Sequence, residues 1–344
     1  MINTLTSLRL FFALLVFTSH LVIISDSFSG HLFIEGYVGV SFFFILSGFI
    51  IAHNYNNRVG NSYERRNYYI ARIARIYPLH LLTLIAAVAL SGFAATKLLS
   101  WIQLTMSATL TNAYIPRSDF FFALNAPAWS LCCEQLFYIT FPFILPFIRE
   151  QKRFVAIILL FLAIIIIGEQ ITPEAYKKGV WYVNPITRYP DFLIGIATLE
   201  TYNRVKEMHI GRLTATAIEI CSILLFALFY IYAEEIPKIY RYSFYYWLPI
   251  VAIILIFALQ KGLLSEFLSN RVFILGGEIS FSVYLIHLFI VNAIGVHLPH
   301  INAWTGAGLA LVATLAISYL SYQYYEKPMN RIVKKWLGYR KNIG

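Results

Sequence analysis

Four ionisable side chains lie inside long apolar stretches of the sequence, where a charge is costly. They are Arg9, His20, Glu134 and His287. A charged group near the centre of a bilayer costs at least about 2.5 kcal/mol, so such residues usually face the interior of a helix bundle and serve a function. A histidine beside a carboxylate has its tautomer fixed and its basicity raised, which suits it to take a proton from a hydroxyl nucleophile. Two histidines and a carboxylate therefore predict general-base chemistry.

Arg9 and His20 belong to the first apolar stretch, residues 5–25. Eleven residues make three helical turns, or roughly 16 Å, so both side chains are expected on one helix face. Taken singly, Arg9 also fits a side chain that reaches toward lipid phosphate, and His20 fits a hydrogen bond between helices. The catalytic interpretation of His20 therefore depends on its neighbours.

Two of those neighbours come from later stretches. Glu134 lies about six residues from the outer end of the stretch 128–148, at a depth similar to that of His20, and His287 lies slightly outside the middle of the stretch 272–296. Three proton-handling groups from three helices are thus predicted in the outer half of the membrane. The alternatives are a packing hydrogen bond for His287 and a structural contact with a neighbouring helix for Glu134.

A cluster of arginines follows the second apolar stretch. Arg72 and Arg75 are three residues apart and therefore adjacent on a helix, and Arg65 lies two turns before Arg72. Planar guanidinium groups bind phosphate through paired hydrogen bonds. Arg72 and Arg75 are therefore candidates for binding the phosphates of a cytoplasmic donor. The alternative is a positively charged loop that touches lipid headgroups.

The composition indicates that these residues are held by a membrane protein. Of 344 residues, 59% are hydrophobic and only 13% are charged, and the mean hydropathy is +0.67. Soluble domains carry about 25% charged residues, and apolar stretches of about 18 residues or more can cross a hydrocarbon core of about 30 Å. The predicted fold is an all-α, polytopic transmembrane helix bundle of about ten spans. They are residues 5–25, 36–56, 77–95, 128–148, 154–169, 186–201, 212–233, 245–260, 272–296 and 303–325.

The distribution of charge predicts the orientation. If the N-terminus is inside and the semi-apolar stretch 99–114 is an interfacial or re-entrant helix, most of the 27 Lys and Arg residues fall near cytoplasmic ends. Both termini are then cytoplasmic, and residues 57–76 form a long inner loop. Anionic inner-leaflet lipids explain the net charge of +10, which argues against nucleic-acid binding. The three cysteines lie in apolar spans without metal-ligand spacing, so no metal site is predicted.

Six short motifs follow one another along nearly the whole chain. They are residues 7–20, 39–49, 72–78, 129–138, 280–287 and 325–328. In this order they resemble the acyltransferase-3 family of integral membrane O-acyltransferases, which add acetyl groups to bacterial surface polysaccharides. The arginine and histidine of the first motif have the family's spacing of ten intervening residues. Cys132 and Cys133 depart from the family pattern just before Glu134.

The resemblance implies a donor, an acceptor and a location. The donor would be an acyl-CoA, acetyl-CoA in the first instance, and the acceptor a hydroxyl of an extracytoplasmic or lipid-linked glycan at the bacterial inner membrane. Residues 1–326 would form the transmembrane acyltransferase domain and residues 327–344 a basic cytoplasmic tail. His20 would act as general base or carry the acyl group, with Glu134 and His287 beside it, while Arg9, Arg72 and Arg75 would hold the donor.

Two other functions fit the residues without the resemblance. Intramembrane histidine and glutamate also build proton relays, so a proton-coupled transporter or flippase of a lipid-linked or anionic substrate is the main alternative. Such proteins often contain internal repeats with helices broken at Gly or Pro, and the sequence shows no convincing repeat. A lipid-binding sensor or scaffold without chemistry is a third interpretation.

Overall fold

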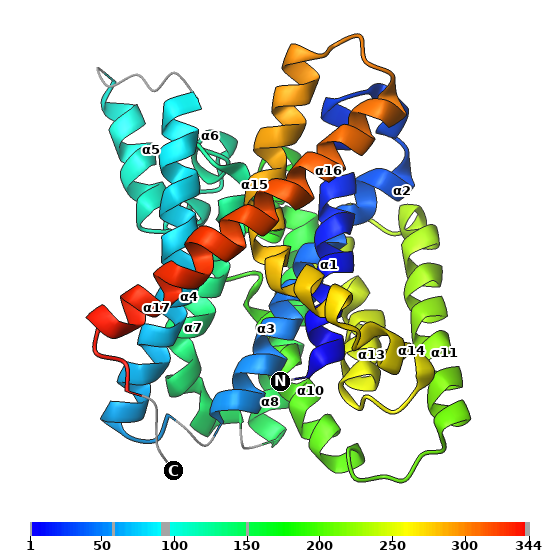
Figure 1. The fold of residues 1–344 in the computed structure, drawn as a ribbon. Coiled ribbons are helices and arrows are strands. Elements are labelled where there is room, and N and C mark those ends of the chain that lie inside the picture. Colours follow the sequence, from blue (N-terminus) through cyan, green and yellow to red (C-terminus); the bar gives the residue numbers. More distant parts are fainter. Residues whose placement is uncertain (1, 57–58, 91–96, 149–150, 341–344) are drawn as a thin grey trace. The chain divides into compact units, whose positions relative to one another are not determined.

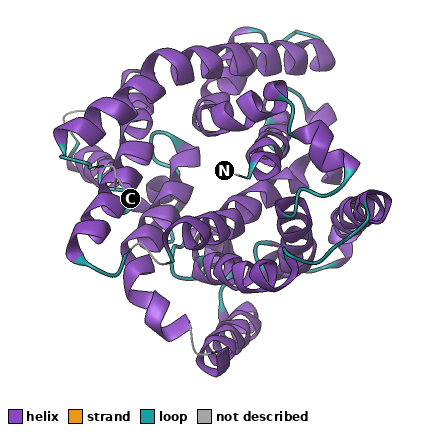
Figure 2. Ribbon diagram, turned by 60° about the horizontal axis from the view of Figure 1, so that its bottom comes forward, coloured by secondary structure: helices purple, strands orange, loops and turns teal. Residues whose placement is uncertain are grey.

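The computed structural model describes residues 2–56, 59–90, 97–148 and 151–340. Within these ranges every regular element is a helix, which confirms the all-α prediction (Figure 1, Figure 2). The helices form two compact units. The first unit comprises Met1–Ile50 and Asp191–Tyr319, and the second unit comprises Ile51–Pro190 and Leu320–Gly344. The chain therefore passes from the first unit to the second within one helix, after residue 50. It returns to the first unit within another helix, at residue 191.

Seven helical segments of the described chain are long and apolar enough to cross a membrane. They are Asn3–Ile23, His31–Tyr55, Ser62–Leu90, Ala126–Leu145, Arg212–Glu235, Arg271–His297 and Ala303–Trp336. Two shorter apolar segments, Phe154–Gly168 and Phe244–Ala258, coincide with two more of the predicted spans. The remaining predicted span corresponds to α10 (Tyr189–Val205). The protein is thus a multi-helix membrane protein, whereas ten crossings and two cytoplasmic ends remain predictions.

The first unit is built around α1 (Asn3–Thr18), which packs lengthwise on α15 (Arg271–His297) (Figure 1). A Cβ atom on Gly277 of α15 would lie 1.7 Å from the carbonyl oxygen of Thr6, so only glycine permits this close approach. The rest of the unit consists of longer helices and of short helices that connect them. They are α2 (His31–Ile34), most of α3 (Gly39–Tyr55), most of α10, α11 (Arg212–Ile231), α12 (Lys238–Arg241), α13 (Trp247–Ala258), α14 (Leu263–Leu268) and nearly all of α16 (Ala303–Ser321).

Buried hydroxyl groups fix the N-terminal half of α1. Thr4 donates a hydrogen bond to the carbonyl of Phe257 at 2.6 Å, and Ser7 donates to the carbonyl of Leu268 at 2.6 Å. Both hydroxyl-bearing residues are fully buried. Each bond satisfies a carbonyl near a helix end that would otherwise lack a partner, so α1 is held in register against α13 and α14.

The second unit is organised by the long helix α4 (Ser62–Leu90). Its other helices are α5 (Leu98–Ala108), α6 (Ser118–Phe121), α7 (Trp129–Ile148), α8 (Gln151–Ile171), α9 (Glu174–Lys177) and α17 (Lys327–Trp336). The last of these lies beside α4 (Figure 1). Residues 327–336, predicted as part of a tail, are therefore a helix packed on the unit.

The structure tests the predictions made for residues 57–76 and 99–114. Residues 57–76 were expected to be an inner loop, but α4 begins at Ser62 and continues into the apolar part of the helix. The loop prediction was wrong because polar and charged residues there belong to the exposed first turns of a helix rather than to irregular chain. The stretch 99–114 contains α5, whose 11 residues span only about 16 Å, too short for a crossing.

Candidate active site

His20 lies just beyond the end of α1, on the turn that follows Thr18. The expectation that Arg9 and His20 share one face of an uninterrupted helix is therefore not met, because the helix ends two residues before the histidine. Arg9 remains on α1 and is half-buried. His20 is also half-buried, and a short 3₁₀ turn, Leu21–Ile23, follows it directly.

The structure brings His20 together with His287, which lies 267 residues later in the middle of α15. The Nδ1 atom of His20 lies 3.3 Å from the Nε2 atom of His287, and the ring centroids are 5.0 Å apart. His287 is only 1% exposed, so of the two rings that of His20 is the one within reach of a substrate. Two of the three residues predicted to handle protons, His20 and His287, are thus neighbours in the first unit.

Backbone carbonyls select the tautomers of the pair. The Nδ1 atom of His287 lies 2.8 Å from the carbonyl oxygen of Tyr284, and the Nδ1 atom of His20 lies 3.0 Å from that of Val16. Because a carbonyl oxygen only accepts, each neutral ring carries its proton on Nδ1. Nε2 of His287 is then the acceptor that faces Nδ1–H of His20. It follows that Nε2 of His20 carries a lone pair.

Glu134 belongs to the second unit, on α7, and its carboxylate accepts a 2.8 Å hydrogen bond from the hydroxyl of Tyr138 one turn later. The ring of Tyr138 in turn lies 5.5 Å from the guanidinium carbon of Arg72. Within this unit the structure therefore connects the predicted carboxylate to a predicted donor-binding arginine through one tyrosine.

Arg72 is held in a cage of three tyrosines. Its guanidinium carbon lies 5.3 Å from the ring of Tyr55 and 5.9 Å from that of Tyr68, in addition to the contact with Tyr138. Cation–π contacts of this kind keep a cation fixed without neutralising its charge. Among the described residues, neither Nε of Arg72 nor the buried hydroxyl of Tyr68 has a hydrogen-bond partner. Two buried donors without an acceptor among the described residues thus lie beside a fixed positive charge.

Arg75 makes an ion pair instead of a cage contact. Its Nη1 atom lies 2.8 Å from Oε1 of Glu326, whose side chain is 5% exposed. Two further contacts join the same segments: Tyr325 donates to the carbonyl of Pro78 at 3.1 Å, and Asn330 donates to the carbonyl of Ala74 at 2.8 Å. Proline at position 78 lacks an N–H, which leaves the Ala74 carbonyl without its helical partner, and Asn330 supplies the missing donor.

Sequence reasoning did not find Glu326 as the partner of Arg75, although the closing motif contains it. It also missed a buried cluster around Glu35 in the first unit. The carboxylate of Glu35 pairs with Arg241 and accepts from the hydroxyls of Tyr246 at 2.8 Å and Tyr37 at 3.0 Å. The contacts with Arg241 and Tyr246 join segments about 200 residues apart, and no local pattern signals them.

The structure shows a helical membrane protein whose first unit holds two histidine rings in contact. The comparisons with known proteins specify the class further. The chain belongs to the acyltransferase-3 family, because the acyltransferase-domain model of that family matches residues 2–323. It is therefore a membrane acyltransferase, as the six motifs predicted.

The names of two of three relatives refer to acyl transfer. The chain is 27% identical to the acyltransferase MdmB of Streptomyces mycarofaciens, over 96% of this chain and 92% of that protein. It is 27% identical to the exopolysaccharide production protein ExoZ of Rhizobium meliloti, over 88% and 92% of the two chains. It is 25% identical to the peptidoglycan O-acetyltransferase OatA of Listeria monocytogenes, over 86% of this chain but 51% of OatA. No solved structure gave a match.

Proposed function

We propose that the protein transfers an acyl group, acetyl in the first instance, from cytoplasmic acyl-CoA to a hydroxyl of an extracytoplasmic or lipid-linked glycan at the bacterial inner membrane. The observation that carries the proposal is the 3.3 Å contact between His20 and His287, which leaves Nε2 of His20 with a lone pair. The names of ExoZ and OatA, which refer to exopolysaccharide and peptidoglycan, support a glycan acceptor.

In the direct route, Nε2 of His20 takes the proton of the acceptor hydroxyl as the oxygen bonds to the acyl carbon of the thioester. The carbon–sulfur bond then breaks, and the imidazolium returns the proton to the CoA thiolate. In the alternative route, Nε2 of His20 bonds to the acyl carbon while the carbon–sulfur bond breaks and CoA leaves as the thiolate. The glycan hydroxyl oxygen then bonds to the acyl carbon, the bond from that carbon to Nε2 breaks, and the hydroxyl proton passes through Nε2 to the thiolate. Mass spectrometry of protein incubated with donor alone distinguishes the routes, since only the second yields an acyl-histidine.

Each remaining predicted residue has a place in this proposal. His287 is a positioning residue, because it is buried and acts through the proton on His20. Arg72 binds the donor, with its Nε–H and the hydroxyl of Tyr68 donating to a phosphate or thioester oxygen. Arg9 lines the donor route, Arg75 contributes positive charge while it holds Glu326, and Glu134 orients Tyr138 against Arg72.

The decisive experiment uses membranes that contain the protein, radiolabelled acetyl-CoA and candidate polysaccharides. His20→Ala should abolish label transfer, whereas the matched control His300→Ala, at an exposed position of the same unit, should leave it unchanged. Full transfer by His20→Ala would rule out this mechanism. Proton-coupled uptake of the saccharide without label in the glycan would instead favour a transporter.

The donor site is tested by a second set of variants. Tyr68→Phe removes one hydroxyl donor and should raise the KM for acetyl-CoA by about 10- to 100-fold with little change in kcat, because a hydrogen bond to a charged group contributes about 1.5–3 kcal/mol. Tyr324→Phe, at an exposed site of the same unit, is the control. An unchanged KM for Tyr68→Phe and for Arg72→Gln would refute the assignment of the donor site.

A further inference from the structure

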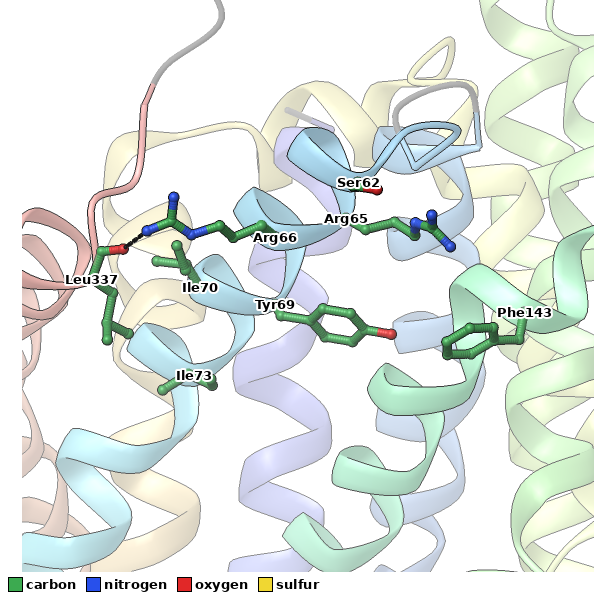
Figure 3. Close-up of a pocket in the computed structure, with 8 residues that line it drawn as sticks. All are labelled: Ser62, Arg65, Arg66, Tyr69, Ile70, Ile73, Phe143 and Leu337. Atoms are coloured by element: carbon green, nitrogen blue, oxygen red, sulfur yellow. Dashed lines mark hydrogen bonds between the residues drawn. The ribbon is translucent and has the colours of Figure 1, made fainter.

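A pocket of about 570 Å³ opens beside the first turns of α4 in the second unit. Its lining comes from α4, from α7 and from the segment after α17. The residues are Ser62, Arg65, Arg66, Tyr69, Ile70, Ile73, Phe143 and Leu337 (Figure 3). None of the residues placed above in catalysis or donor binding lines it. The pocket therefore needs an explanation of its own.

The two arginines of the pocket differ in their hydrogen bonds. Figure 3 shows their side chains extending in opposite directions from α4. Arg66 donates from Nη2 to the carbonyl of Leu337 at 2.9 Å, so this side chain caps the end of α17. Within the described part of the chain, Arg65 has neither an ion pair nor a hydrogen-bond acceptor. Arg65 is half-buried, so its uncompensated charge lies inside the pocket region and not on a fully solvated surface.

The walls of the pocket are fixed and largely apolar. The hydroxyl of Tyr69 donates to the carbonyl of Ile139 at 2.9 Å, which holds its ring between α4 and α7. Phe143 is 57% exposed and Ile73 is 42% exposed, so both offer apolar surface without a protein partner covering it. The segment that carries Leu337 is tied to α4 again by Asn67, which donates to the carbonyl of Arg340 at 2.9 Å.

An uncompensated guanidinium next to uncovered aromatic and aliphatic side chains matches one ligand chemistry. A guanidinium binds phosphate with paired, charge-assisted hydrogen bonds, and apolar walls bind an apolar or planar body. We infer that the pocket binds the phosphate ester of an amphiphilic molecule, with the phosphate on Arg65 and the apolar part against Ile73 and Phe143.

Two sources could supply this chemistry at the same site. One is the nucleotide end of the acyl-CoA donor, and only this source rests on the proposed function. The other is the headgroup of an anionic phospholipid, for which an arginine beside exposed apolar side chains in a membrane protein is equally suited. Both possibilities are tested by measuring binding and not acyl transfer. If the catalytic proposal fails, the pocket proposal can therefore still be tested.

The test uses the full chain in phosphatidylcholine nanodiscs. One arm titrates adenosine 3′,5′-bisphosphate by calorimetry, and the other measures retention of phosphatidylglycerol by native mass spectrometry. Arg65→Gln should weaken binding of one probe by about tenfold or more, since one charge-assisted contact is lost. Arg331→Gln, an equal change of charge at an exposed position of α17 outside the pocket, should have no effect.

Further variants keep the test decisive. Arg65→Lys preserves the charge but not the two-pronged geometry, so it should bind with intermediate affinity. Phe143→Ala should weaken the same probe that Arg65→Gln weakens. Loss of bisphosphate binding assigns the pocket to the donor, and loss of phosphatidylglycerol binding assigns it to lipid. If wild type binds neither probe, or if Arg65→Gln binds both as wild type does, the inference is wrong.

Discussion

The replacement His287→Phe would isolate the contribution of the buried histidine. Phenylalanine keeps a ring in the same buried space of α15 but offers no acceptor to the Nδ1–H of His20. The lost contact is one hydrogen bond between neutral groups at 3.3 Å, and such a bond contributes about 0.5–1.5 kcal/mol. His20 retains the carbonyl of Val16 at 3.0 Å from Nδ1, which still favours the productive tautomer. We therefore expect kcat to fall only about two- to tenfold.

Initial rates of label transfer from acetyl-CoA, measured over a range of donor concentrations, separate this effect from a binding defect. The KM for the donor should stay constant, because His287 is buried among His20, backbone carbonyls and the rings of Phe17 and Tyr284 and does not contact the donor in this proposal. His287→Gln should recover most of the rate, since its side-chain oxygen can accept from Nδ1–H. By contrast, His20→Ala removes the base itself and should cost about 10²- to 10⁴-fold.

Two outcomes would refute the reasoning. If His287→Phe lost as much activity as His20→Ala, His287 would have to exchange a proton or acyl group itself. If His287→Phe kept the full wild-type rate, the tautomer of His20 would not depend on this contact. A lower melting temperature for His287→Phe than for His287→Gln would point to a packing defect, so thermal unfolding in detergent should accompany the kinetics.

Two further predictions concern stability and assembly. Arg75→Gln should lower the free energy of unfolding by about 2–3 kcal/mol, because it removes the cation 2.8 Å from the buried carboxylate of Glu326. Glu326→Gln in the same chain should restore part of that loss in a double-mutant cycle. Equal additive losses would contradict a direct pair. Gly277→Ala should prevent stable accumulation of the protein, since the new methyl group would lie 1.7 Å from the carbonyl oxygen of Thr6. The control is Gly308→Ala, whose methyl group would have no atom within 4 Å and should be neutral or slightly stabilising. Immunoblots and thermal unfolding measure both variants.

Much of the fold could be predicted because apolar stretches are local features. A run of about 20 apolar residues fixes a helix and its length, so most of the predicted spans coincide with helices of the structure. The start of α4 was predicted only in part. The spacing of Arg65, Arg72 and Arg75 was interpreted as helical, but residues 62–75 are too polar for a membrane-spanning pattern, so the span was expected to begin only at residue 77.

The candidate site was predictable in part. His20 and His287 were found because an ionisable group in an apolar stretch is conspicuous wherever it occurs. The sequence predicted only that the two histidines lie at a similar depth in the membrane. It could not predict their contact, since no sequence pattern gives the distance between two helices. The partner of Arg75 was missed because Glu326 lies 251 residues away, and an ordinary glutamate at the end of a span carries no signal of its own.

The discontinuous make-up of the first unit has a consequence for how the protein is made. Residue 287 leaves the ribosome 267 residues after residue 20, which at about 5–20 residues per second is on the order of 10 to 50 seconds. During that interval the second unit is synthesised almost completely, while the hydroxyls of Thr4 and Ser7 lack their final acceptors. The newly inserted first helix must therefore be sheltered by lipid, by the insertion machinery or by temporary helix partners until α15 arrives. Mutations at the α1–α15 contact would then act first on biogenesis, through proteolytic removal of waiting chains, before they act on turnover.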